Sequence, residues 1–95
     1  MVLNPPSAKE RLLALSERFH ALLLEDPFLL ASLPEGFVLA VIPLDDPEAQ
    51  GLALEGLSRA GKWEGEGPLV YALFRGEELL LVITPQGPLL PARAA

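Results

Sequence analysis

Three carboxylates stand close together at the end of an apolar run, and they are the best candidates for chemistry in the chain. Asp45, Asp46 and Glu48 follow a segment of six apolar residues, 37–42, which we interpret as a strand. Ligands bind at the carboxyl ends of strands in α/β sheets, and carboxylate oxygens are the ligands that Mg²⁺ prefers. The sequence therefore allows a small-ligand or divalent-metal site at these three residues.

The same carboxylates also have a purely structural interpretation, which we favour. Asp46 is a good helix N-cap, Pro47 suits the first helical turn, and Glu48 is favourable near the positive end of the helix dipole. A helix start explains all three residue types without any ligand. The ligand or metal site at Asp45, Asp46 and Glu48 is kept as the alternative.

Trp63 is the second candidate, because it lies between Lys62 and Glu64 in a loop with several glycines. A tryptophan on a loop can contact a ligand or a partner protein. It can equally fold back onto the hydrophobic core, which we favour.

The residues needed for most other chemistries are missing from the sequence. The chain has no cysteine and one histidine, His20, so a thiolate nucleophile and a site that needs two imidazoles are excluded. Neither a phosphate-binding loop, a dinucleotide-binding glycine pattern nor a nucleophile elbow is present. We expect no cofactor and lean against an enzyme, with carboxylate chemistry as a weak third possibility.

Composition and charge limit the class of protein further. Thirteen acidic and seven basic residues give a net charge of −6, which disfavours binding to nucleic acid. The longest apolar runs, 37–42 and 69–74, are far shorter than the ~20 residues of a membrane span. The start of the chain has no secretory signal pattern. We therefore expect a cytoplasmic protein with no nucleic-acid or membrane partner.

The chain is long enough for one small domain. It has 95 residues, of which 51% are hydrophobic, so a single domain over 1–95 with flexible ends at 1–6 and 92–95 is predicted. Ten prolines and few thermolabile residues are typical of a thermophile. A GC-rich genome would favour the same residues, and both explanations stay open.

The spacing of apolar residues and the positions of capping and turn residues predict the order of the elements. Ser7 with Glu10 forms a capping-box pattern before a helical stripe of apolar residues that ends near Glu25. A short helix after Asp26, a strand over 37–42 and a helix over 47–60 follow. The segments 69–75 and 78–84 flank Gly76-Glu77, which predicts a hairpin with a type II′ turn. The fold class is α/β or α+β, in which two main helices cover a three-stranded mixed sheet.

None of the three predicted strands has a polar face. Such strands belong to sheets that are covered on both sides, so either the N-terminal helix covers the second face or another subunit does. We predict a homodimer joined through the sheet or its edge, where the edge would be the last strand, 79–83. In a regular hairpin register, the residues that lie near the dimer contact are Tyr71, Leu73, Leu80 and Val82. The predicted function is a non-enzymatic module that self-associates or binds a protein partner.

Overall fold

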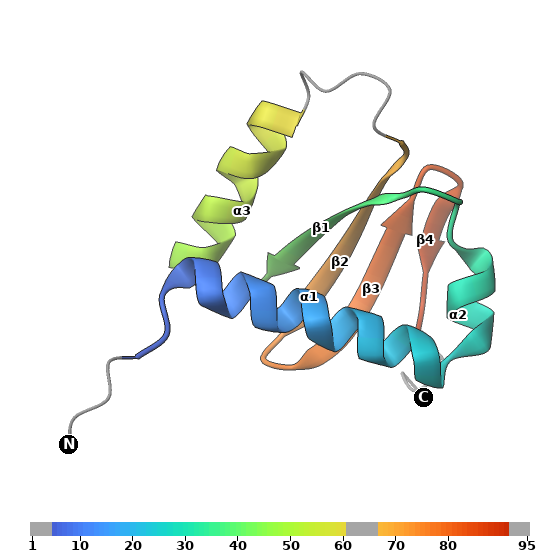
Figure 1. Ribbon diagram of the computed structural model, residues 1–95, viewed down its shortest axis with the longest axis horizontal. Coiled ribbons are helices and arrows are strands. Elements are labelled where there is room, and N and C mark those ends of the chain that lie inside the picture. Colours follow the sequence, from blue (N-terminus) through green and yellow to red (C-terminus); the bar gives the residue numbers. More distant parts are fainter. Residues whose placement is uncertain (1–4, 61–66, 92–95) are drawn as a thin grey trace.

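The computed structural model describes residues 5–60 and 67–91 and contains three helices and four strands within them (Figure 1). The predicted single small domain with helices and a mixed sheet is confirmed, and the fourth strand is the one addition. The elements in chain order are α1 (Ala8–Glu25), α2 (Pro27–Ser32), β1 (Val38–Pro43), α3 (Pro47–Ala60), β2 (Leu69–Arg75), β3 (Glu78–Thr84) and β4 (Gly87–Leu89).

Polar caps fix the helix starts where the sequence predicts them. The Ser7 side chain accepts a hydrogen bond from the Glu10 N–H, and the Glu10 carboxylate accepts one from the Ser7 N–H, both at 3.2 Å. Asp26 caps α2 in the same way, since its Oδ1 accepts the Leu29 N–H at 3.1 Å. These bonds satisfy backbone donors that a helix leaves free at its first turn.

The sheet has the strand order β1-β2-β3-β4, with β1 and β2 parallel and the remaining pairs antiparallel. The expectation of three strands misses β4, because the tail turns back directly after β3. Thr84 stabilises this reversal: its hydroxyl accepts the Gln86 N–H at 3.1 Å and donates to the Gly87 carbonyl at 2.9 Å. Strand β4 pairs with residues 82–84 of β3 and so occupies one end of the edge at which a second copy was predicted to pair; the pairing along 79–83 stays a prediction.

The hairpin between β2 and β3 follows the predicted register only next to its turn. Gly76 has a φ of +57°, which a type II′ turn requires at its first central residue. Among the described residues, only glycines have a positive φ. Arg75 pairs with Glu78 as predicted, and a bulge then leaves Leu80 without a partner. One extra residue in a strand reverses the faces of the residues beyond it.

This bulge corrects the predicted position of Val82. Val82 pairs with Ala72, and both side chains are fully buried in the core. The regular register instead placed Val82 beside Tyr71 on the opposite face, which is wrong. Tyr71 pairs with Ile83, and Leu73 pairs with Leu81.

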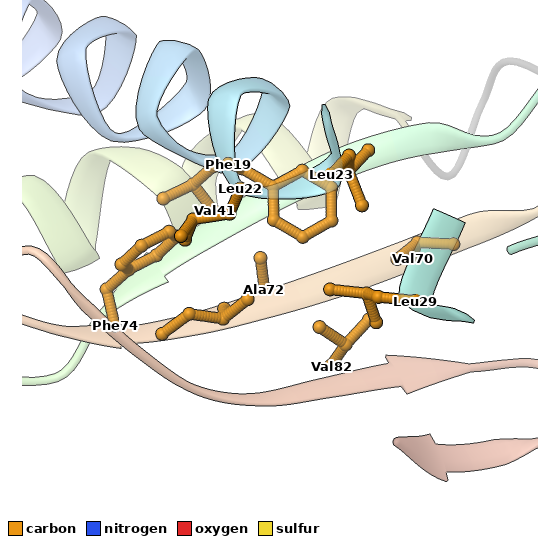
Figure 2. Packing of buried hydrophobic residues seen from close by; sticks show 10 residues of the cluster. Phe19, Leu22, Leu23, Leu29, Val41, Val70, Ala72, Phe74 and Val82 are labelled. Atoms are coloured by element: carbon orange, nitrogen blue, oxygen red, sulfur yellow. The ribbon is translucent and has the colours of Figure 1, made fainter. Parts of the chain in front are cut away.

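The hydrophobic core lies between one face of the sheet and helices α1 and α2. Figure 2 shows Phe19, Leu22 and Leu23 of α1 above Ala72 of the sheet, with Leu29 of α2 beside them. Burying the side chains of this cluster is the main force that holds α1 on the sheet.

The other face of the sheet is only partly covered, since Ala40 and Ile42 of β1 are buried next to α3, whereas Tyr71 and Leu73 of β2 remain half-buried. Helix α3 contacts β1 and α1, and Figure 1 shows it beside β1 rather than over the sheet. We call this side the open face. Strand alternation and the pairing register assign to it eight uncharged residues, Val38, Ala40, Ile42, Leu69, Tyr71, Leu73, Leu81 and Ile83, and the charged pair Arg75 and Glu78 next to the hairpin turn.

Candidate functional site

The three candidate carboxylates lie where β1 passes into α3. Pro43 ends β1, and Asp46 caps α3 by accepting the Ala49 N–H at 3.2 Å. The favoured interpretation of Asp46 as a helix cap therefore agrees with the contacts in the structure. The same cap brings the carboxylates of Asp46 and Glu48 beside the first turns of α1.

Arg11 of α1 forms ion pairs with the carboxylates of Asp46 and Glu48. Its Nε donates to Asp46 Oδ2 at 2.7 Å and its Nη2 donates to Asp46 Oδ1 at 3.2 Å, a two-pronged contact. Nη2 also donates to Glu48 Oε1 at 2.7 Å, and Nη1 donates to the Pro6 carbonyl at 2.6 Å. One guanidinium therefore joins α1, the start of α3 and the segment before α1.

The electrostatics of this group follow from the same contacts. Hydrogen bonds from Arg11 and from the Ala49 N–H lower the pKa of Asp46, because both stabilise its ionised form. The two carboxylates raise the pKa of Arg11 in return. Asp46 therefore stays ionised at neutral pH and is not suited to donate or accept a proton.

Asp45 serves a different contact from its neighbours. Both of its carboxylate oxygens accept the Gly76 N–H, at 3.1 and 3.0 Å. The bond fastens the loop after β1 to the turn of the hairpin. The carboxylate of Asp45 therefore binds a different donor from that of Asp46, which accepts hydrogen bonds from Arg11 and from the Ala49 N–H.

This arrangement stabilises the fold and does not assemble a cluster of free acids. Within the described ranges, 5–60 and 67–91, no group of three or more histidine, aspartate or glutamate residues could hold a metal ion. The small-ligand or metal site at Asp45, Asp46 and Glu48 stays a prediction. Sequence reasoning missed Arg11, whose distance of 35 positions from Asp46 leaves no local signal.

The open face brings together two of the four residues predicted for a dimer contact. Tyr71 and Leu73 lie on it and are half-buried, while Ile83 beside Tyr71 is 36% exposed. Leu80, the bulged residue, is also half-buried. Ile83 was missed because the predicted register had no bulge.

Trp63, the candidate loop residue, lies outside the described residues. Among the residues that are described, no helix is long and apolar enough to cross a membrane.

Comparisons with known proteins give a family and a similar structure. A protein-family profile described as "Family of unknown function (DUF5647)" matches residues 7–87. The chain is also similar to the crystal structure of a hypothetical protein, TTHC002, from Thermus thermophilus. The two have a TM-score of 0.65 and 36% sequence identity, over 74% of this chain and 85% of the other. No curated protein matches the chain.

Proposed function

The chain belongs to the family of unknown function DUF5647, and we propose that it is a non-enzymatic module that self-associates into a homodimer through the open face. The observation that carries the proposal is the chemistry of that face. Apart from Arg75 and Glu78, which pair next to the hairpin turn, the side chains assigned to it carry no charge, although the chain as a whole has a net charge of −6. A contiguous apolar surface on a soluble domain marks an interaction site.

The degree of exposure supports the centre of the face as the contact. Ala40 and Ile42, on the strand next to α3, are buried at 8% and 9% exposure. Leu69, Tyr71 and Leu73 on β2 remain half-buried. Apolar area is therefore left to bury along β2 and β3, away from α3.

The size of the face can be compared with that of a small dimer interface. Three strands of six or seven residues, with ~4.8 Å between neighbours, give a projected area of roughly 300 Å² per subunit. Side chains make the true surface larger than its projection. Two such projections amount to roughly half of the ~1,200 Å² of total buried area at the lower end of specific interfaces, so the relief of the side chains must supply the rest.

Face-to-face packing of two identical sheets is a symmetric arrangement. A two-fold axis brings the same patch of both subunits together, so no surface is left to continue into a fibre. The β2 residue Tyr71 lies near the middle of the patch, where its hydroxyl requires a partner from the second subunit. We propose that the module works in the cytoplasm without nucleic-acid or membrane partners.

The second interpretation, a ligand or metal at Asp45, Asp46 and Glu48, has no comparable support. Asp46 and Glu48 are paired with Arg11, and Asp45 is bonded to Gly76. A ligand would have to displace these contacts before binding.

Light scattering with a matched pair of variants tests the dimer. The native protein should have twice its chain mass of 10.2 kDa at micromolar concentrations. Ile83→Glu places a charge on the open face and should give the single-chain mass. Leu24→Glu places the same charge at an 83% exposed leucine of α1 and should leave the dimer intact. A native protein of single-chain mass throughout, or a dimer insensitive to Ile83→Glu, would contradict the proposal.

A further inference from the structure

A groove of about 360 Å³ runs along the outer edge of β1. Four consecutive residues of the strand, 38–41, line it. Successive side chains of a strand point to opposite faces, so a hollow that touches four in a row includes the edge of β1. Leu69 of β2, the partner of Val38, also lines it, so the groove extends onto the open face at the start of β1. Its walls are apolar and come from α1 and α3, through Leu12, Leu13, Leu52 and Ala53.

The backbone of β1 turns unpaired hydrogen-bonding groups into this groove. The N–H groups of Val38 and Leu44 donate to carbonyls on the β2 side of the strand, both at 2.7 Å. Residues 39 and 41 alternate with them, so the N–H and C=O groups of Leu39 and Val41 point the other way. No described residue hydrogen-bonds to these outward groups. Unpaired edge groups are a template for another strand.

Helix α3 leaves space beside this edge. In Figure 1, α3 and β1 lie close together where the strand ends and the helix begins, and they diverge toward their other ends. Gly56 of α3 lines the groove, and a Cβ atom added there would meet no other atom within 4 Å. A side chain added at Gly56 would therefore extend into open space.

The groove also has a cation at one end. Lys9 lies at the N-terminal end of the α1 wall, and within the described part of the chain the ion pairs are formed by Arg11 and not by Lys9. An apolar ligand with one carboxylate would complement this charge.

We propose that the groove binds an extended apolar peptide segment of a partner protein, which adds to β1 as a further strand and places an acidic side chain next to Lys9. A strand supplies backbone partners for Leu39 and Val41, and its alternate side chains contact the walls from α1 and α3. Neither edge of a second copy fits well: β4 has three residues and Pro88 has no N–H to donate, and β1 lies between its own walls from α1 and α3.

Titration of the isotope-labelled protein with defined peptides tests this proposal. The probe is a pool of acetylated, amidated pentapeptides in which valine or isoleucine alternates with threonine and one end carries aspartate. Saturable shifts of the backbone amide signals should centre on Leu39 and Val41. Peptides N-methylated at the central amides should bind about fivefold more weakly for each hydrogen bond lost.

Two helical glycines give a matched pair of variants. Gly56→Leu fills the groove, whereas Gly51→Leu makes the same change at a glycine outside the groove lining. Both positions have open space and gain helix propensity, so both variants should fold. Peptide binding should be lost in Gly56→Leu and kept in Gly51→Leu. Lys9→Glu should weaken binding of the aspartate-bearing peptides severalfold.

Several outcomes would overturn the proposal. One is the absence of saturable shifts at millimolar peptide. Another is binding that is insensitive to N-methylation or equally strong for dodecanoate, which would indicate a site for apolar molecules in general. A third is a Gly56→Leu protein that loses its dimer, because the groove would then be an interface between copies.

Discussion

Val82 and Ile83 are adjacent in sequence and point to opposite faces of the sheet, and the bulge at Leu80 determines that Val82 faces the core. Val82 is fully buried in the core and Ile83 is 36% exposed on the open face. Threonine differs from valine by a hydroxyl in place of a methyl group. We predict that Val82→Thr is strongly destabilising and that Ile83→Thr is nearly neutral in the monomer.

The magnitude follows from the burial of each site. A hydroxyl transferred into the core without a partner costs about 1–3 kcal/mol. In a domain of this size each kcal/mol lowers the melting temperature by about 4–8 °C, so ~2 kcal/mol at Val82 should lower it by roughly 8–16 °C. The change at Ile83 should stay within about 0.5 kcal/mol, as at most surface positions.

Urea unfolding at two protein concentrations measures both effects. The free energy of unfolding lost in Val82→Thr should be the same at both protein concentrations, because the core is formed within one chain. The loss in Ile83→Thr should appear only at the higher concentration, where dimer formation adds to the free energy of unfolding. If Ile83→Thr were the more damaging change at low concentration, Val82 would face outward and the bulged register would be refuted.

Three further predictions concern the turn and the carboxylates. Gly76→Val should destabilise the protein by about 1–2 kcal/mol in urea unfolding, because Gly76 has a φ of +57°; an unchanged midpoint would contradict the turn assignment. Folding lowers the pKa of Asp46 below its ordinary value of 3.8, so the ionised carboxylate stabilises the fold at pH values above 3.8. This contribution disappears as the pH falls through 3.8 and then through the lower pKa of the folded state. Asp46→Asn should therefore flatten the dependence of the melting temperature on pH below about 4, and an unchanged acid profile would show that the pair with Arg11 does not matter. Divalent cations should not raise the melting temperature, and a reproducible rise that Asp45→Asn abolishes would instead support the metal site.

Features set by neighbouring residues were predictable from the sequence. The capping box of Ser7 and Glu10, the Asp46 cap and the Gly76 turn each depend on residue types within a few positions. The order of the helices and strands follows from these signals and from apolar spacing. The fold class was therefore accessible without coordinates.

Features that depend on distant contacts were not predictable. The Leu80 bulge has no distinctive residue type, and it determines whether Val82 or Ile83 faces the core. The pairing of Arg11 with Asp46 joins residues 35 positions apart. Apolar strands indicate that both faces of the sheet require cover, but the same pattern is compatible with cover by a helix or by a second subunit. The position of α3 beside β1 leaves one face open.

The most direct measurement of self-association through the open face is an isotope-filtered NMR experiment on a mixture of labelled and unlabelled chains, which detects only contacts between subunits. The proposed dimer predicts intermolecular contacts of the Tyr71 ring with methyl groups of Leu73, Leu81 and Ile83. Absence of any intermolecular contact at a concentration where the mass is that of a dimer, or contacts confined to α1 and α3, would contradict it.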